Sequence, residues 1–252
     1  MAYSLIEGKM SKIFITGSSD GLGLLSAQAL ASRGHKVYLH ARNAQRAEDA
    51  RRGCPQATDC LIGNLSSTSE TKSLAEKLNE NGPWDAIIHN AGIMRGGEGG
   101  ELFTINTMAP YLLTCLVDPP PKRYVFLSSG MHQGGDASLR NIERCGYSDS
   151  KLHNIMLAFW FSRRFGNKVA CNSMDPGWVA TKMGGSSAPD DIDAAVDTYV
   201  MLAEGGGAAK GQTGMHWYQK HLRNTKPAAA DEQVQDKLIS VLQHVSGVMP
   251  LK

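Results

Sequence analysis

The sequence predicts a single doubly wound α/β domain, and three observations support this. Short apolar segments alternate with helical patterns from residue 12 onward. Connections of this kind are right-handed βαβ crossovers, which build a parallel sheet with helices on both faces. The chain has 252 residues, 42% of them hydrophobic, and no shift in composition marks a domain boundary. One core can bury the apolar residues of such a chain. We therefore expect one domain at 12–252 after an N-terminal extension at 1–11.

The expected elements follow from apolar spacing and from capping residues. Seven strands are expected at residues 12–16, 37–41, 60–65, 84–89, 123–127, 168–173 and 214–218. Helices are expected at residues 22–33, 44–52, 67–81, 103–117, 147–165, 191–203 and 232–245. Doubly wound sheets bind ligands beyond the carboxyl ends of their strands, where the strand order switches. The loops after the first, fourth, fifth and sixth strands are therefore the expected functional loops.

Composition excludes several classes of protein. The net charge is only +2, whereas a nucleic-acid binder usually has a basic excess. No apolar run reaches the ~18 residues that a membrane span needs. The five cysteines form no CxxC pair, which favours free thiols in a reducing compartment over a metal site. Residues 1–9 lack the basic and apolar segments of a signal peptide. We expect a cytoplasmic protein without a metal, a nucleic-acid partner or a membrane span.

A glycine-rich turn joins the first expected strand to the first expected helix. Residues 16–23 read TGSSDGLG. Glycines let the backbone approach a pyrophosphate, and the helix N-terminus offers free N–H donors and a partial positive charge. The alternative is an ordinary flexible turn in a chain with 27 glycines. Its place between strand and helix favours nucleotide binding.

This turn and four later motifs resemble the short-chain dehydrogenase/reductase family. The turn has that family's TGxxxGxG spacing, and residues 89–92 (HNAG) resemble its NNAG. Further matches are the serine pair at 128–129, YxxxK at 147–151, and DPG at 175–177 with a threonine at 181. The likeness covers residues 12–183. It is strongest to the retinol-dehydrogenase-like branch and to NADP-dependent carbonyl reductases. It implies a Rossmann fold and an oxidoreductase that uses a nicotinamide cofactor.

The candidate catalytic residues are Ser129, Tyr147, Lys151 and Asn106. Tyr147 and Lys151 share a helix face, and an ammonium there lowers the pKa of the phenol. Tyr147 could then exchange a proton with a substrate oxygen that the Ser129 hydroxyl holds. The alternative for the Tyr–Lys pair is a surface helix pair. Ser128 competes with Ser129, but the family's serine is usually the second of such a pair. By resemblance Asn106 holds a water in a proton relay, whereas it could also cap or kink a helix.

The end of the second expected strand indicates which cofactor is used. Ala41 leaves room for a 2′-phosphate, and the Arg42 guanidinium can grip it, so NADP(H) is favoured over NAD(H). The alternative is a solvated Arg42. Asp20 is a counter-signal because a carboxylate repels phosphate, although it could instead cap the helix that begins at Gly21. Arg46 is a second candidate for the phosphate.

The resemblance implies further contacts on both sides of the cofactor. The remaining expected cofactor residues are Gly17, Ser19, Leu22, Gly23, Asn64, Leu65, Asn90, Ala91, Gly92, Pro176, Gly177, Val179 and Thr181, with Lys151 on the ribose hydroxyls. Candidate substrate residues are mostly large and apolar: Met94, Met131, His132, Trp178 and Met183, with Trp217 as a further candidate. They suggest a hydrophobic substrate, the alternative being ordinary packing. Residues 184–189 could form a lid or a disordered connection.

The expected activity is NADP(H)-dependent interconversion of a carbonyl and a secondary or primary alcohol. One alternative is a regulator or scaffold that binds NADP(H) without turnover, since fold does not fix function. The presence of the serine, tyrosine and lysine together favours an enzyme. A third option is dehydration or epimerisation with the same residues. A homo-oligomer could form through helices beside the fifth strand, where residues 157–165 (LAFWFSRRF) have excess aromatic surface.

Overall fold

An eight-stranded sheet forms the centre of the protein, in a computed structural model that describes residues 10–96 and 100–251. Its strands lie in the order β3-β2-β1-β4-β5-β6-β7-β8. Their bounds are β1 Lys12–Ile15, β2 Lys36–Ala41, β3 Asp59–Ile62, β4 Ala86–His89, β5 Arg123–Leu127, β6 Ala170–Asp175, β7 His216–Tyr218 and β8 His221–Leu222. The first seven are parallel, as predicted, and β8 is a short antiparallel addition that the sequence did not predict. Most of the expected N-terminal extension, residues 1–9, lies outside the described residues.

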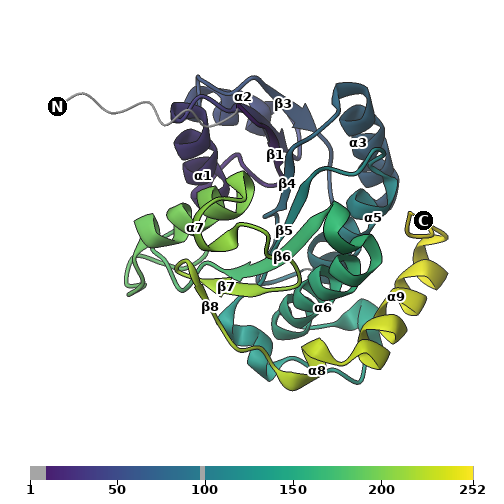
Figure 1. The fold of residues 1–252 in the computed structure, drawn as a ribbon. Coiled ribbons are helices and arrows are strands. Elements are labelled where there is room, and N and C mark those ends of the chain that lie inside the picture. The colour runs from purple at the N-terminus through teal and green to yellow at the C-terminus, as the bar shows by residue number, and fades with distance from the viewer. Residues whose placement is uncertain (1–9, 97–99, 252) are drawn as a thin grey trace.

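Helices cover both faces of this sheet, which confirms the doubly wound prediction (Figure 1). On one face α1 (Gly21–Ser32), α2 (Ala44–Gly53) and α7 (Ile192–Glu204) contribute to one hydrophobic core. On the other, α3 (Thr68–Asn81), α5 (Ala109–Leu116) and α6 (Tyr147–Phe165) contribute to a second core. The sheet order reverses between β1 and β4, so their carboxyl ends flank the expected ligand crevice.

The helix expected at residues 103–117 contains a π-helical turn in the structure. It consists of α4 (Glu101–Phe103), a π-helical turn (Thr104–Met108) and α5. Pro110 stands in the first turn of α5 and has no N–H to donate to the preceding turn. Widened turns of this kind occur mostly at functional sites. The turn here contains Asn106.

Two C-terminal helices pack on α6. Helix α8 (Pro227–Ala230) was not predicted, and α9 (Glu232–Ser246) lies beside α6 and leads to the C-terminus near α5 (Figure 1). Trp160 of α6 donates a hydrogen bond from Nε1 to Asp236 Oδ1 at 2.8 Å. The face expected to support a homo-oligomer is therefore covered by the chain's own C-terminal helix.

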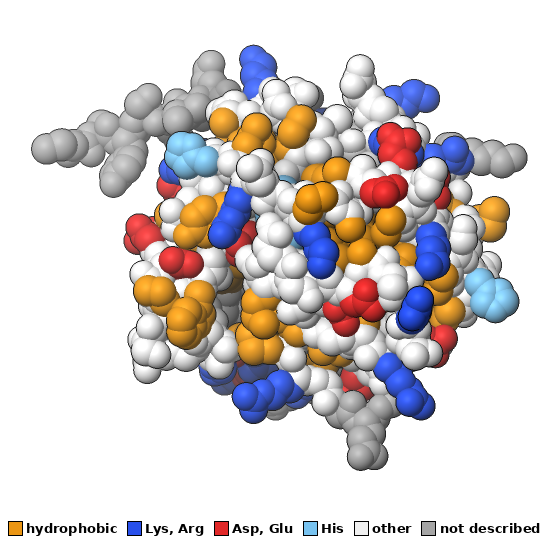
Figure 2. All heavy atoms as spheres, turned by 90° about the horizontal axis from the view of Figure 1, so that it is seen from below, with side chains coloured by type: hydrophobic (Ala, Val, Ile, Leu, Met, Phe, Trp, Pro, Cys, Tyr) orange, Lys and Arg blue, Asp and Glu red, His pale blue; other side chains and the backbone are white. Residues whose placement is uncertain are grey.

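Neither a membrane span nor a metal cluster occurs in the described part of the chain. None of its helices combines the length and apolar character needed to cross a bilayer. None of its His, Cys, Asp and Glu side chains gather in groups that could hold a metal. The face seen in Figure 2 carries lysine and arginine side chains interspersed with acidic and apolar ones. This face offers no uniformly basic surface of the kind that nucleic acid requires.

Candidate active site

The expected catalytic side chains meet where β5 ends and α6 begins. Ser129 follows β5 by two residues, and Tyr147 is the first residue of α6. Burial raises the pKa of the half-buried Tyr147 phenol, and a hydrogen bond with the Ser129 hydroxyl partly offsets this. Ser128 points elsewhere, because its hydroxyl donates to the Lys151 carbonyl at 2.8 Å. This geometry favours Ser129 over Ser128 for contact with a substrate oxygen.

Lys151 lies beneath the tyrosine and away from solvent. Its ammonium is 5.3 Å from the centre of the Tyr147 ring and donates to the Leu127 carbonyl at 3.0 Å. Only 4% of the residue is exposed, and this burial lowers the pKa of the ammonium to about 8. Lys151 is therefore not part of an exposed pair on the helix surface, which was the alternative interpretation of the Tyr–Lys spacing. A cation that has lost its hydration stabilises a nearby phenolate strongly.

Asn106 connects the π-helical turn to the loop after β4. Its Oδ1 accepts from the Ile93 N–H at 2.8 Å, and its Nδ2 donates to the Ile93 carbonyl at 2.9 Å and to Ser150 Oγ at 3.0 Å. A Cβ added to Gly92 would lie 3.3 Å from both Asn106 Oδ1 and Lys151 Nζ. Asn106 thus fixes the chain next to Lys151. Its role in a water relay stays a prediction.

The glycine turn is shaped for close approach of the backbone. Gly17 has φ +62°, and a Cβ there would lie 2.8 Å from Ala91 Cα. A Cβ on Gly23 would come within 2.5 Å of the Gly17 carbonyl and of Asn90 Nδ2. Asn90 Nδ2 donates to the carbonyls of Thr16 and Gly17 at 2.9 and 3.0 Å. Because Gly17 and Gly23 have no side chains, the turn can pack closely against the end of β4.

Asp20 caps α1, as the alternative interpretation of this residue proposed. Its side chain accepts from the Gly21 N–H at 2.8 Å. It also forms ion pairs with Lys182 at 2.5 Å and Arg46 at 3.3 Å. The hydrogen bond from Lys182 is the main reason that the pKa of Asp20 is lowered. Two cations thus neutralise the negative charge of Asp20, which was the reason to expect repulsion of a bound phosphate.

Arg42 and Arg46 lie near the expected 2′-phosphate position. Arg42 is exposed just past β2, and Arg46 is in the first turn of α2. Arg46 Nη2 reaches Ser19 Oγ at 3.2 Å, so it bridges α2 to the glycine turn. Asn64 accepts from Ser66 at its Oδ1, and Leu65 is buried beside it.

The segment after β6 returns to the glycine turn. Gly177, with φ +84°, follows Pro176, and its N–H donates to the Asp175 carboxylate at 2.9 Å. Val179 is buried and pairs with Asp190 in a β-bridge. Thr181 approaches Gly21: a Cβ added to that glycine would lie 3.9 Å from it. Together with the turn, this segment borders the expected cofactor site.

The expected substrate residues divide into exposed and buried ones. The exposed set, with 39–58% of each residue exposed, is Met94, Met131, Trp178 and Met183. Trp178 Nε1 donates to the Gly184 carbonyl at 2.7 Å, which ties it to the expected lid segment. His132 and Trp217 are buried, and His132 Nδ1 lies 2.6 Å from the Ser129 carbonyl. His132 is therefore placed to support the serine loop, and its contact with substrate stays a prediction.

Sequence reasoning missed an ion pair next to these residues. Asp175 ends β6 with 2% exposure, and its Oδ2 accepts from Arg223 Nη1 at 2.6 Å. The sequence offered Asp175 only as part of the DPG motif. Nothing in the sequence connected it to Arg223, which follows the unpredicted strand β8.

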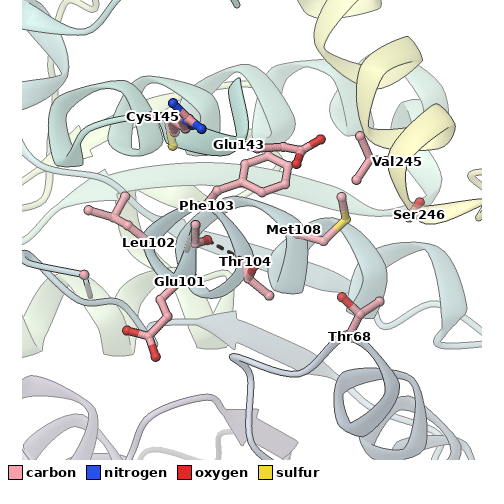
Figure 3. Close-up of a pocket in the computed structure, with 13 residues that line it drawn as sticks. Thr68, Glu101, Leu102, Phe103, Thr104, Met108, Glu143, Cys145, Val245 and Ser246 are labelled. Carbon is pink, nitrogen blue, oxygen red and sulfur yellow. Dashed lines mark hydrogen bonds between the residues drawn. The ribbon is translucent and has the colours of Figure 1, made fainter. Parts of the chain in front are cut away.

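A hollow of about 640 Å³ lies elsewhere on the molecule (Figure 3). Its lining includes Phe103, Met108, Glu143, Cys145 and Val245, from α4, the π-helical turn, the segment before α6, and α9. None of the expected site residues belongs to the lining. We therefore assign it no part in the chemistry of the serine, tyrosine and lysine.

Comparison with known proteins decides the family. The family model described as short chain dehydrogenase matches residues 11–192. The chain belongs to the short-chain dehydrogenase/reductase family. An uncharacterised oxidoreductase of Emericella nidulans is 45% identical over 250 residues, which cover 95% of this chain and 98% of that protein. This short-chain dehydrogenase/reductase is therefore an oxidoreductase by family.

Two further comparisons bear on the expected branch and on the fold. Human retinol dehydrogenase 14 is 32% identical to this short-chain dehydrogenase/reductase, over 71% of this chain and 64% of that protein. A short-chain dehydrogenase of Escherichia coli CFT073, solved in complex with NADPH, superposes with a TM-score of 0.68. It is 22% identical and covers 87% of this chain and all of that one. This second likeness supports the Rossmann fold.

Proposed function

We propose that this protein is an NADP(H)-dependent oxidoreductase that interconverts a carbonyl and an alcohol of a small, hydrophobic substrate. The observation that carries the proposal is the buried Lys151 ammonium, which lies 5.3 Å from the Tyr147 ring beside Ser129. A protein that only bound the cofactor could use Lys151 on the ribose hydroxyls, but it would have no use for a tyrosine that contacts a serine above that ammonium. Burying such a charge costs stability, so its retention points to chemistry.

The chain's own residues would perform the proton half of the reaction. The Ser129 hydroxyl would hold the substrate oxygen close to the phenol. Tyr147 would donate its proton to a carbonyl oxygen, or accept one from an alcohol in the reverse direction. Lys151 would stabilise the phenolate that forms. The nicotinamide cofactor supplies or accepts the hydride when it is bound.

The glycine turn fits a dinucleotide. Helix α1 starts at Gly21, directly after the turn, so its free N–H groups face the place that a pyrophosphate would occupy. Added side chains at Gly17 and Gly23 would collide with backbone, which shows that the turn depends on glycine. Arg42 and Arg46 would bind the 2′-phosphate that distinguishes NADP(H) from NAD(H).

The first experiment is a fluorescence titration of the protein with NADPH and with NADH. We expect NADPH to bind at least ~30-fold more tightly, which corresponds to about 2 kcal/mol. Tighter binding of NADH would reverse the cofactor assignment. Binding of neither would contradict the enzyme proposal, and binding without reduction of any carbonyl in a panel of ketones and aldehydes would favour a regulator.

Arg42→Ala tests the phosphate contact directly. We expect this change to weaken NADPH binding tenfold or more and to leave NADH binding nearly unchanged, because only NADPH has the 2′-phosphate. The same titration measures both. Arg52→Ala is a matched control, since Arg52 is exposed at the far end of α2 and pairs with Asp49. An equal effect of Arg42→Ala on both cofactors would remove Arg42 from phosphate recognition.

A further inference from the structure

The ion pair of Asp175 and Arg223 has unusual surroundings. The carboxylate is almost fully buried, with its Oδ1 accepting from the Gly177 N–H and its Oδ2 from Arg223 Nη1 at 2.6 Å. The Arg223 side chain is 44% exposed. A buried carboxylate is strongly unfavourable without a partner. The C-terminal hairpin β7–β8 therefore supplies the cation that this position needs.

The pair lies against the loop that carries the catalytic serine. A Cβ added to Gly130, the residue after Ser129, would lie 3.3 Å from Asp175 Oδ2 and 3.9 Å from both terminal nitrogens of Arg223. The guanidinium also sits 4.6 Å from the centre of the Tyr218 ring. Contacts with a carboxylate and an aromatic ring hold Arg223 in place.

Several titratable groups face this carboxylate. They are Arg223 after β8, Tyr218 in β7, His132 after β5, Asp190 after β6, and Tyr147 and Lys151 in α6, and Tyr199 of α7 faces Tyr147. Burial raises the pKa of Tyr147 and lowers that of Lys151, and the Asp175 carboxylate raises both. A negative charge favours a protonated phenol and a protonated amine alike. Arg223 opposes this influence by neutralising the carboxylate.

We propose that Asp175 and Arg223 are positioning residues whose ion pair sets the negative charge felt by Tyr147, and thereby the pH range in which Tyr147 exchanges its proton. This inference rests on the proposed function, in which Tyr147 is the acid–base group. The pair acts through its charge and its contact with Gly130. The hairpin that carries Arg223 becomes part of the catalytic machinery in this way.

The test removes each charge separately and then both together. Asp175→Asn keeps the shape and removes the negative charge, so the titration midpoint of Tyr147 should fall by about half a pH unit or more. Arg223→Gln leaves the carboxylate uncompensated, so the midpoint should rise. The double variant removes both charges together, so its midpoint should lie between those of the two single variants, near the native value.

The readout is the ultraviolet absorbance of tyrosinate during a pH titration without substrate. Subtracting the same variant with Tyr147→Phe isolates Tyr147 among the seven tyrosines. Circular dichroism at each pH shows that the variants stay folded. The pH dependence of kcat/KM for alcohol oxidation should move in the same order, because oxidation needs the deprotonated phenol.

Arg33→Gln is the matched control. Arg33 pairs with Glu204 at 2.6 Å, the same distance, but it caps the far end of α1 from the glycine turn. It should leave the midpoint unchanged. The proposal is overturned if neither Asp175→Asn nor Arg223→Gln moves the midpoint, or if both move it in the same direction.

The two proposals fail in distinguishable ways. If Asp175→Asn and Arg223→Gln shift the Tyr147 midpoint in opposite directions but the protein reduces no carbonyl, the ion-pair inference is supported and the oxidoreductase function is rejected. Carbonyl turnover with an unmoved tyrosine midpoint would support the function and reject the inference.

Discussion

At the scale of single residues, the structure places Tyr147 in the environment that the proposed reaction needs. The phenol is hydrogen-bonded with the Ser129 hydroxyl, the Lys151 ammonium lies 5.3 Å from the centre of its ring, and burial raises its pKa. A tyrosine in such a place stays protonated until a substrate oxygen accepts the proton, and a nearby cation then stabilises the phenolate. This is the behaviour expected of a general acid in carbonyl reduction.

Tyr147→Phe should abolish turnover and preserve cofactor binding. The substitution removes only the hydroxyl, so the glycine turn and Lys151 stay in place. We expect kcat to fall by a factor of about 100 or more, with NADPH affinity within about twofold of the native value. Steady-state kinetics and fluorescence titration measure the two quantities. Tyr38→Phe, in the core near Trp84, is the control, and retained turnover in Tyr147→Phe would exclude it as the acid.

Burial of the Lys151 ammonium costs stability. Its pKa of about 8 lies below the ordinary value of 10.5, so the unfolded chain binds more protons than the native protein between these values. The contribution of Lys151 to the free energy of unfolding should therefore rise as the pH increases from about 8 to 10.5. Below about pH 8 the full cost of burying the ammonium is present.

Lys151→Met should thus stabilise the inactive protein at neutral pH. The Leu127 carbonyl would still accept from Asn154 Nδ2 at 2.9 Å, so no buried acceptor is left unpaired. We expect a gain on the order of 1–3 kcal/mol at pH 7 that shrinks as the pH rises from 8 to 10.5. Chemical denaturation at several pH values measures it. A loss of stability at pH 7 would show that Lys151 is structurally favourable.

At the scale of elements, the turn between β1 and α1 depends on close backbone contact. Gly23 has no positive φ, so any L-residue could adopt its backbone conformation. What excludes a side chain is the Gly17 carbonyl and Asn90 Nδ2, both 2.5 Å from where a Cβ would stand. The requirement for glycine there is steric.

Gly23→Ala should therefore displace the turn and weaken NADPH binding tenfold or more. The displaced backbone would no longer present the N-terminus of α1 to the pyrophosphate. Gly206→Ala is the matched control, because Gly206 has φ −100° and its Cβ would meet nothing within 4 Å. Cofactor titration of the two variants measures the effect. Native affinity in Gly23→Ala would mean that the turn can adjust without cost.

At the scale of the whole molecule, α9 covers the outer face of α6. Leu238 and Leu242 are fully buried, and Arg163 of α6 donates to Gln235 Oε1 at 2.9 Å. Beyond the helix, the Val248 carbonyl accepts from the Tyr111 hydroxyl at 2.7 Å. Association through this face of α6 would require α9 to leave.

We accordingly expect a monomer by sedimentation equilibrium and a strong dependence of folding on α9. Leu238→Ala should reduce the free energy of unfolding by about 2–5 kcal/mol, because it leaves a cavity against α6. Ser240→Ala on the exposed side of α9 should change it by less than about 0.5 kcal/mol. A dimer that survives at nanomolar protein would show that another surface associates.

The sequence alone predicted the seven parallel strands, the main helices between them and the glycine turn, but it missed β8 and α8. Its choice of Ser129, Tyr147 and Lys151 as catalytic residues stays a prediction. Strands, helices and the turn depend on local spacing, which a chain displays before it folds. The sequence also left the right alternatives open, because Asp20 caps α1 and Asn106 lies in a distorted helix. Pro110, at the start of α5, is the sequence signal for the π-helical turn that precedes it.

Only the tertiary structure decided which distant residues become neighbours. Asp175 and Arg223 are 48 positions apart, and Asp20 and Lys182 are 162 apart. No periodicity encodes such pairs, since they form only when β8 and the segment after β6 are placed against the sheet. The burial that lowers the pKa of Lys151 likewise arises from packing of α6 on β5. The sequence therefore predicts which groups react, and packing determines the environment in which they titrate.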